Sequence, residues 1–315
     1  MSRIIGIDFG GTAIKMGLVS EGGTVLTRAN EPFNPGKPFG ELINSVWASL
    51  QDLLGSEIEP IRAIGIATPG YADPATGILI DGTHNVGALK GRSLTKEFSE
   101  RFRVPSFVDN DGTCAAVGEL RYGAGRRFRN FVLITLGTGI GGGVVVNREI
   151  ITGDGGIPPE IGAICLDPDG PVNYSGIPGT FERLACASGF EELYRQLSGR
   201  KETRMNPQDI FRLAQEGENA AKATVDQVGR YIAQAFGIMV NLLNLEACLI
   251  GGGIAAAGPP LLEAVRKHLS SFTWPNLLRN AQVLLSELGN DAGIVGAAAM
   301  AIQRMSQKEK LEVSS

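Results

Sequence analysis

Residues 6–15 read GIDFGGTAIK, an apolar strand that carries one carboxylate and runs into a glycine turn. The turn lacks the Gly-Lys-Ser or Gly-Lys-Thr ending of a Walker loop. Residues 16–30, MGLVSEGGTVLTRAN, remain strand-like, whereas a dinucleotide fingerprint must open a helix. The pattern therefore predicts a β-meander whose turn, Gly10, Gly11 and Thr12, presents backbone N–H groups to an anion.

A second stretch repeats this arrangement at residues 131–152, FVLITLGTGIGGGVVVNREIIT. An apolar strand again enters a glycine-threonine turn, here Gly137, Thr138 and Gly139, and two further strands follow. Either turn alone is compatible with an ordinary hairpin, because glycine is common in turns. Two matched meanders about 130 residues apart indicate an internal duplication, one copy per domain, and favour two turns that share one polyphosphate.

Asp8 lies just before the first turn. A carboxylate beside a phosphate is repulsive unless a cation lies between them. Asp8 therefore predicts Mg²⁺, bound directly or through water.

A third glycine loop, IGGGIAAAG at residues 250–258, joins a strand to a helix. Such a loop suits the adenine or ribose of a nucleotide. It is equally compatible with close packing of the helix on the strand.

Residues 109–111 read DND at a strand end where a helix begins. Aspartate in this place is most often a helix cap. Asn110 and Asp111 together offer more, an amide that can fix a hydroxyl and a carboxylate that can take its proton. The helix N-terminus favours the ionised carboxylate that a general base requires.

Composition limits the remaining possibilities. The 315 residues suggest two domains, and the net charge of −4 gives no electrostatic footprint for nucleic acid. The four scattered cysteines fit a reducing compartment, and two histidines are too few for a multi-histidine metal centre. The opening MSRIIGID predicts an immediate strand and no signal peptide, and interrupted apolar stretches predict no membrane span. We expect a cytoplasmic protein.

Taken together, the motifs resemble those of the ROK family (repressors, open reading frames and sugar kinases). The resemblance runs over about residues 3–303 and rests on GIDFGGTAIK, IATPG, NVGALKG, VDNDGTCAAVGE, LGTGIGGG, EIG, GIPGTFE and LIGGGIA. It implies a two-domain α/β protein of the actin-like ATPase (ribonuclease H-like) fold, with a cleft between the domains. We expect a small domain of residues 1–111 and 291–305, a large domain of residues 112–290, and a flexible tail of residues 306–315.

The resemblance also implies roles for individual residues. Asp111 is expected to be the base that deprotonates the sugar's 6-hydroxyl. The expected sugar ligands are Gly70, Asn85, Asn110, Glu160 and Glu182. The expected ligands of ATP and Mg²⁺ are Asp8, Gly10, Gly11, Thr12, Lys15, Gly137, Thr138, Gly139, Gly252 and Gly253.

One departure concerns a structural zinc. The family usually has one histidine and three cysteines as zinc ligands, and here those positions hold Ala163, Asn173, Ser175 and Thr180. Cys165 lies nearby, but a single thiolate cannot make a four-ligand site. We therefore expect no zinc, and we hypothesise that Pro168, Pro171 and Pro178 stiffen the loop instead.

The expected activity is ATP-dependent phosphorylation of a hexose, with glucose as the first candidate substrate. In the family the missing histidine also contacts the sugar, so Ala163 weakens that contact by about one hydrogen bond, ~1 kcal/mol. The space could equally admit a 2-acetamido group, so a kinase for N-acetylglucosamine or N-acetylmannosamine is the alternative. A non-catalytic sugar-binding regulator and a sugar-independent ATPase stay open. The family's repressors carry an N-terminal helix-turn-helix, which this chain is not expected to have, and its kinases imply a homodimer.

Overall fold

The computed structural model describes residues 3–55, 60–82, 84–200 and 205–314. The chain divides into two compact units. Unit 1 comprises Met1–Arg126, Ile150–Pro159 and Asn290–Ser315, and unit 2 comprises Arg127–Glu149 and Glu160–Gly289.

The sheet of unit 1 has the strand order β3-β2-β1-β4-β7. Its strands are β1 (Arg3–Phe9), β2 (Ala13–Ser20), β3 (Val25–Pro32), β4 (Ile61–Thr68) and β7 (Ser106–Asn110). β1, β2 and β3 form an antiparallel meander, and β4 and β7 add in parallel on the other side of β1. The predicted first meander is therefore confirmed.

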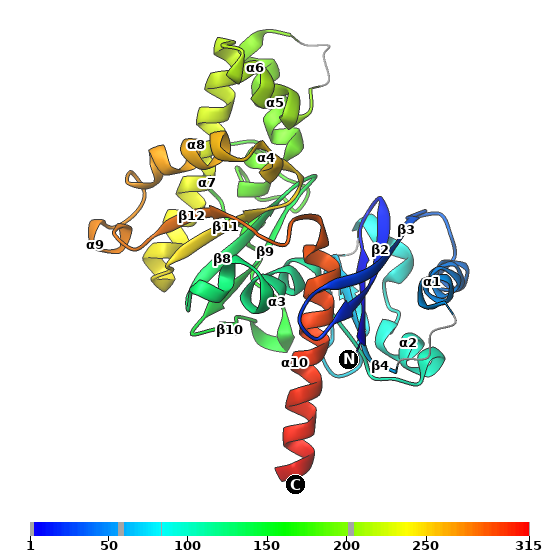
Figure 1. Cartoon of the computed structure of the whole chain (residues 1–315). Helices are drawn as coiled ribbons and strands as arrows, with labels where there is room; N and C mark the ends of the chain where they lie inside the picture. The colour runs from blue at the N-terminus through cyan, green and yellow to red at the C-terminus, as the bar shows by residue number, and fades with distance from the viewer. Residues whose placement is uncertain (1–2, 56–59, 83, 201–204, 315) are drawn as a thin grey trace. The chain divides into compact units, whose positions relative to one another are not determined.

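Helices α1 (Phe39–Leu54) and α2 (Leu94–Phe102) cover one face of this sheet (Figure 1). α1 turns Leu42, Val46 and Leu50 toward the sheet, at the four-residue spacing of an amphipathic helix. These side chains are fully or almost fully buried in a core shared with β1, β2 and β4.

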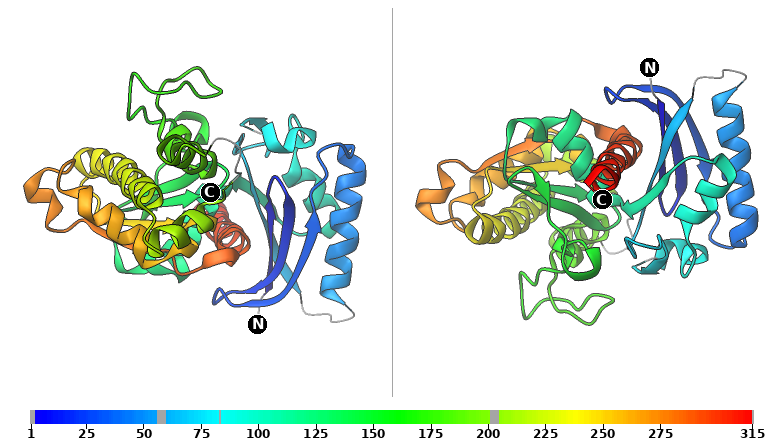
Figure 2. Two further views of the ribbon diagram at one scale, coloured as in Figure 1. Left: turned by 90° about the horizontal axis from the view of Figure 1, so that it is seen from above. Right: turned by 90° about the horizontal axis from the view of Figure 1, so that it is seen from below.

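The opposite face is covered by α3 (Asp111–Tyr122) and α10 (Ala292–Ser314) (Figure 2). α10 approaches the strands closely because they present glycine to it. A Cβ atom at Gly6 or Gly65 would lie 2.0 or 1.9 Å from a carbonyl oxygen of α10. The small residues of α10 itself permit this close approach.

The sheet of unit 2 has the order β10-β9-β8-β11-β12. Its strands are β8 (Phe131–Leu136), β9 (Ile140–Val146), β10 (Glu149–Ile150), β11 (Ala247–Gly251) and β12 (Gln282–Leu285). β8 pairs antiparallel with β9 and parallel with β11, as β1 does with β2 and β4. The two sheets therefore have the same topology, which confirms the predicted duplication.

The helices of unit 2 pack with its sheet into a single large core, and α7 and α8 lie side by side (Figure 1). They are α4 (Phe181–Ala185), α5 (Ala187–Ser198), α6 (Pro207–Gln215), α7 (Asn219–Leu243), α8 (Pro259–Leu269) and α9 (Pro275–Leu278). The short elements of the chain are β5 (Tyr71–Ala72), β6 (Leu79–Asp81), η1 (His84–Leu89), η2 (Ala124–Arg127), η3 (Asp154–Gly156), η4 (Ile161–Ala163), η5 (Gly253–Ala257) and η6 (Gly289–Asp291).

The boundaries of the units differ from the expected domains in two places. The whole of α3 belongs to unit 1, because it packs on α10 and β7. Residues 150–159 also belong to unit 1. At the C-terminus, α10 continues to Ser314, where the sequence predicts a flexible tail from residue 306.

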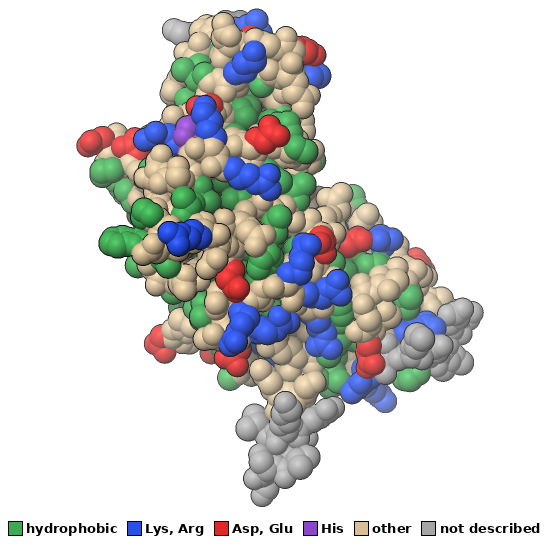
Figure 3. Space-filling view, turned by 60° about the vertical axis from the view of Figure 1, so that its left-hand side comes forward, with side chains coloured by type: hydrophobic (Ala, Val, Ile, Leu, Met, Phe, Trp, Pro, Cys, Tyr) green, Lys and Arg blue, Asp and Glu red, His purple; other side chains and the backbone are tan. Residues whose placement is uncertain are grey.

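Figure 3 shows several basic side chains gathered near the middle of the face drawn, with acidic side chains around them. Every helix in the described part of the chain is too short or too polar to span a lipid bilayer.

Candidate active site

The first glycine turn joins β1 to β2 in unit 1. It is closed by the Gly10 N–H, which donates to the Ala13 carbonyl oxygen at 3.0 Å. Gly11 and Thr12 are exposed at its tip. Exposed backbone at a tight turn is what a phosphate cradle requires, and the structure places the predicted residues there.

Asp8 and Lys15 lie at the base of this turn, opposite each other in the antiparallel register of β1 and β2. Lys15 Nζ also donates to the Asn290 carbonyl oxygen at 3.5 Å. Gly293, in the first turn of α10, lets that helix reach the carboxylate, since a Cβ there would lie 2.2 Å from Asp8 Oδ2. Gly293 was not predicted from the sequence, because its contact with Asp8 joins residues 285 positions apart.

Asn110 ties the start of α3 to the loop after β4. Its side-chain oxygen accepts from the Thr113 N–H at 3.1 Å, which caps α3. Its amide nitrogen donates to the Gly70 carbonyl oxygen at 2.8 Å. Gly70 adopts φ +78°, and a Cβ there would lie 2.1 Å from the Asp81 carbonyl oxygen. Two predicted sugar ligands, Gly70 and Asn110, are thus brought together, and each keeps the other in place.

Asp111 is the first residue of α3 and shares this corner of unit 1. Its carboxylate accepts from the Gly112 N–H at 2.7 Å. Burial raises the pKa of Asp111, and the backbone N–H groups of Gly112 and of Asp111 itself hold it down in part. The pKa of Asp8 is raised to about 6 by burial and then by the negative charge of Asp111, against the opposing charge of Lys15. The two carboxylates are therefore close enough to repel each other, and a divalent cation would relieve that repulsion.

A neighbouring ion pair holds β7 where it meets α3. The Arg304 guanidinium of α10 donates to Asp109 Oδ2, and Asp109 Oδ1 accepts from the Asn110 N–H at 2.8 Å. Burial raises the pKa of Asp109, and Arg304 opposes that rise. Sequence analysis identified Asp109 only as part of the DND motif and missed Arg304, because nothing in a helical stretch indicates a partner 195 residues away.

The second glycine turn joins β8 to β9 in unit 2. Its Gly137 N–H donates to the Gly139 carbonyl oxygen at 3.0 Å. Glu182 of α4 supports the turn, because one of its carboxylate oxygens accepts from the Ile140 N–H at 2.8 Å. A Cβ at Gly139 would lie 2.7 Å from the same oxygen. Glu182, predicted as a sugar ligand, thus also fixes the turn that is predicted to bind phosphate.

A cavity of about 470 Å³ opens beside this turn within unit 2. It is lined by Thr138, Ala187, Ser188, Glu191, Met205, Asn206 and Pro207. The N-terminus of α5 reaches the turn through the Ala187 N–H, which donates to the Gly137 carbonyl oxygen at 2.9 Å. The sequence analysis identified Thr138 but missed the α5 and α6 residues, which no motif singles out.

Gly252 and Gly253 follow β11 and start η5. Gly252 adopts φ +81°, and a Cβ there would lie 2.4 Å from the Leu136 carbonyl oxygen. The Gln208 amide of α6 donates to the Gly253 carbonyl oxygen at 3.1 Å, directly after the α6 residues that line the 470 Å³ cavity. Gly252 is therefore required for close packing, one of the two interpretations that the sequence left open. Gly253 is joined to α6 by Gln208, one residue beyond the last α6 residue that lines the cavity.

Glu160 is exposed before η4, and Tyr174 lies near it. Burial of the hydroxyl and then the charges of Glu182 and Glu160 raise the pKa of Tyr174. All three belong to unit 2, so the predicted glutamates share one neighbourhood with an exposed aromatic ring that sequence analysis missed. Asn85, another predicted sugar ligand, lies in η1, but its side chain is outside the described residues.

The loop that carries the zinc positions of the family has no ligand set for zinc. Asn173 instead accepts three hydrogen bonds at its side-chain oxygen, from the Ser175 N–H at 3.0 Å, the Ser175 hydroxyl at 2.8 Å and the Ile177 N–H at 3.0 Å. Thr180 caps α4 by accepting from the Arg183 N–H at 3.2 Å. Hydroxyl and amide groups that already hold the loop do not fit a thiolate zinc site. Among the described residues, no three His, Cys, Asp or Glu side chains are grouped closely enough to hold a metal ion.

The order of these motifs and their placement on two sheets of one topology agree with a known family. The sequence profile of the ROK family matches residues 4–304. The protein belongs to the ROK family. Its duplicated sheets are therefore those of the actin-like ATPase fold found in that family.

Individual members of the family resemble the whole chain. It is 32% identical to the glucokinase of Halalkalibacterium halodurans, with 97% of each protein covered. It is 28% identical to the N-acetylmannosamine kinase of Shigella flexneri, with 98% of this chain and 99% of that protein covered. Its structure matches that of a ROK family glucokinase from Streptomyces griseus, solved in complex with glucose and AMPPNP, with a TM-score of 0.81 at 27% identity, covering 96% of this chain and all of that one.

Proposed function

We propose that this protein is an ATP-dependent hexose kinase that phosphorylates the 6-hydroxyl of glucose. The observation that carries the proposal is Asp111. Asp111 lies at the N-terminus of α3, where its carboxylate accepts a hydrogen bond from the Gly112 N–H. The preceding residue, Asn110, donates a hydrogen bond to the Gly70 carbonyl oxygen. The relatives named glucokinase, and the related glucokinase bound to glucose and AMPPNP, support this choice of sugar and of phosphoryl donor.

The geometry supports the proposed roles on the sugar side. Asn110 has a second amide hydrogen beyond the one donated to Gly70, and this hydrogen is available to a sugar hydroxyl. Asp111 takes the proton of the attacking hydroxyl, which makes the oxygen a better nucleophile. Its burial raises its affinity for that proton, while the backbone N–H groups keep the ionised form accessible. Glu160, Glu182 and Asn85 are proposed to bind the remaining hydroxyls.

The nucleotide is proposed to occupy the 470 Å³ cavity of unit 2. This volume suits a nucleoside, since ligand pockets commonly measure about 300–1,000 Å³. Thr138 belongs both to the cavity and to the β8–β9 turn, so the base and ribose would lie next to a backbone cradle for phosphate. Gly137 and Gly139 are proposed to donate backbone N–H groups to phosphate from the turn of unit 2. Gly10, Gly11 and Thr12 are proposed, separately, as the phosphate-binding turn of unit 1.

Mg²⁺ is proposed to bind at Asp8. Magnesium sites at phosphates typically use one or two carboxylates with water and phosphate oxygens, and Asp8 with its neighbour Asp111 supplies that charge. When bound, the ion offsets the charge of the phosphates. Lys15, opposite Asp8, is proposed to bind a phosphate oxygen.

A kinase for N-acetylated amino sugars is the second candidate. It is favoured by Ala163, which leaves room where the family has a histidine, and by the similarity to the N-acetylmannosamine kinase. We further propose that the protein is a cytoplasmic homodimer that binds no nucleic acid, in line with its charge of −4.

The test is ADP formation with Mg·ATP across glucose, mannose, fructose, N-acetylglucosamine and N-acetylmannosamine. We expect the highest kcat/KM on glucose and a loss of about 10²–10⁴ in kcat for Asp111→Asn, the usual effect of removing a general base. Asp154→Asn, an exposed aspartate in η3, is the matched control and should leave kcat unchanged. Turnover on no sugar, or turnover indifferent to Asp111→Asn, would contradict the proposal.

A further inference from the structure

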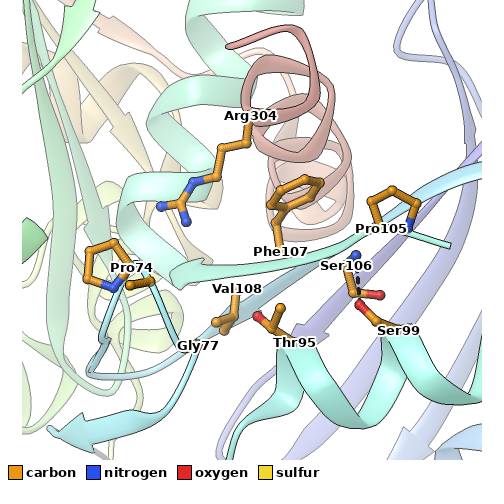
Figure 4. Close-up of a pocket in the computed structure, with 10 residues that line it drawn as sticks. Pro74, Gly77, Thr95, Ser99, Pro105, Ser106, Phe107, Val108 and Arg304 are labelled. Atoms are coloured by element: carbon orange, nitrogen blue, oxygen red, sulfur yellow. Dashed lines mark hydrogen bonds between the residues drawn. The ribbon is translucent and has the colours of Figure 1, made fainter. Parts of the chain in front are cut away.

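A cavity of about 230 Å³ lies in unit 1 beside β7, apart from every residue assigned above to sugar or nucleotide. Its walls come from four segments, the loop at residues 74–77, α2, β7 and α10 (Figure 4). β7 is the edge strand of its sheet, and residues on both of its faces line the cavity.

Arg304 is the charged group of this cavity. Figure 4 shows its side chain reaching from α10 toward Pro74, with the Phe107 ring alongside. Within the described residues, its hydrogen-bond partner is Asp109, and its side chain is 28% exposed. A guanidinium has five N–H donors, so several remain for a ligand.

Two hydroxyls extend this donor set. Thr95 and Ser99 are one turn apart on α2, and both line the cavity. Ser99 Oγ accepts from the Ser106 N–H at 3.1 Å, which leaves its O–H to donate. The Thr95 hydroxyl has no hydrogen-bond partner among the described residues, and the same part of the chain places no carboxylate in the lining. Although Asp109 pairs with the guanidinium, the remaining N–H groups of Arg304 and the two hydroxyls line the cavity without an acidic side chain in the wall, a donor set that favours an anion.

The size and the apolar walls limit what the anion can be. The volume equals roughly seven or eight liquid waters at ~30 Å³ each, which suits a body of three or four carbons. Pro74, Pro105 and Phe107 supply apolar surface for that carbon body.

We propose that this cavity binds a small hydroxylated anion, a phosphate ester or a carboxylate, with Arg304 as its anchor and Thr95 and Ser99 as donors to its oxygens. The anion and Asp109 share one guanidinium. Asp109 also accepts a hydrogen bond from the Asn110 N–H, and Asn110 precedes Asp111. An anion that weakens the Arg304–Asp109 pair therefore changes the hydrogen bonding of the residue next to Asp111. That regulatory consequence rests on the proposed kinase function, whereas binding itself does not.

The test is calorimetric titration of the full chain, without sugar or nucleotide, with glycerol 3-phosphate, glycerate and glycerol as probes. We expect saturable binding of one anion per chain and no binding of neutral glycerol. The difference in affinity between glycerol 3-phosphate and glycerate identifies the preferred head group.

Arg304→Met should weaken anion binding roughly tenfold or more, as loss of a charge-assisted hydrogen bond does. Thr95→Val, which leaves the ion pair with Asp109 intact, should weaken it about threefold to tenfold. Arg92→Met, which removes an exposed guanidinium over the Phe39 ring outside the cavity, is the matched control and should bind as wild type.

Three results would overturn the proposal. The first is no saturable binding of either anion to the wild type. The second is binding that Thr95→Val and Arg304→Met leave unchanged. The third is strictly competitive displacement by AMPPNP, because the anion would then occupy the phosphate turns. None of these results bears on sugar phosphorylation, so the two proposals fail separately.

Discussion

At the scale of single residues, two carboxylates of one unit have different surroundings. Asp111 accepts backbone N–H groups at the start of a helix, which compensate in part for its burial. Asp8 lies on a strand, and burial together with the charge of Asp111 raises its pKa to about 6. These surroundings support the proposed roles, Asp111 as the base that takes the hydroxyl proton and Asp8 as the carboxylate that binds Mg²⁺.

Asp8→Asn should change how stability depends on pH. Because the folded protein holds a proton on Asp8 more tightly than the unfolded chain does, this group stabilises the fold below its ordinary pKa of 3.8. That contribution is lost as the pH rises through about 6. The shift from 3.8 to about 6 corresponds to at most about 3 kcal/mol. Asparagine stays neutral, so the variant should gain stability relative to wild type between about pH 4 and pH 7.

Urea unfolding in EDTA at several pH values measures this difference. Asp73→Asn is the control, because a side-chain hydrogen bond from Thr76 lowers the pKa of that exposed carboxyl instead. A difference between Asp8→Asn and wild type that does not vary with pH would contradict the assignment.

At the scale of elements, the loop before α4 is held by side-chain hydrogen bonds at the positions where the family has zinc ligands. The positions of the family's cysteines hold Asn173, Ser175 and Thr180, and all three form hydrogen bonds that order the loop. The predicted role of Pro168, Pro171 and Pro178 stays a hypothesis. The organising effect of Asn173 was not predicted, because its three bonds depend on a local turn that the residue types alone do not specify.

Asn173→Ala should therefore disturb sugar binding more than nucleotide binding. It removes an acceptor of three hydrogen bonds, worth roughly 1–3 kcal/mol together at a half-buried position. We expect KM for the sugar to rise severalfold, KM for ATP to stay unchanged, and Tm to fall by a few degrees. Ser175→Ala, which removes one of the three bonds, is the graded control. Stoichiometric zinc in the purified protein, or rescue of Asn173→Ala by zinc, would refute the metal-free interpretation.

The packing of α10 on the strands gives a second prediction at this scale. Gly65→Ala should destabilise the protein by roughly 3 kcal/mol or more, because its Cβ would lie 1.9 Å from a backbone oxygen that cannot turn away. Gly40→Ala is the matched control. A Cβ there meets nothing within 4 Å in the first turn of α1, so that variant should be neutral or slightly more stable. Chemical unfolding curves of Gly65→Ala and Gly40→Ala measure this difference in stability. Equal stabilities of the two variants would contradict the prediction, because α10 would then be able to move away from the added methyl group.

At the scale of the whole molecule, chain order and spatial order differ. Unit 1 contains the first strand and the last helix of the chain, and unit 2 lies between them in sequence. α10 buries one face of β1 and β4, so unit 1 lacks part of its core until the final residues are present.

Truncation should reveal this dependence. A chain that ends at Gly289 loses α10, exposes the apolar face of the sheet, and is expected to be insoluble or to unfold without a cooperative transition. A chain that ends at Gln307 keeps the buried part of α10 and should retain its Tm within a few degrees. Circular dichroism melting compares the two, and a cooperative, soluble chain without α10 would contradict the argument.

The sequence by itself determined the elements that local patterns control. Alternating apolar residues and glycine turns specify the two meanders. The motifs also identified the family. They located the turns Gly10–Thr12 and Gly137–Gly139 as well, because a tight turn with exposed backbone N–H groups is rich in glycine. The absence of the family's zinc ligands could also be read from the sequence, because the side-chain type alone decides whether a residue can bind zinc.

Only the tertiary structure decided which distant groups meet. The pair Asp109–Arg304, the approach of Gly293 to Asp8, and the support of Gly139 by Glu182 all join residues from separate segments. The limits of the units and the helix beyond residue 306 were likewise not read from the sequence. The physical reason is that such contacts depend on how sheets and helices pack, and one sequence pattern allows many partners at long range.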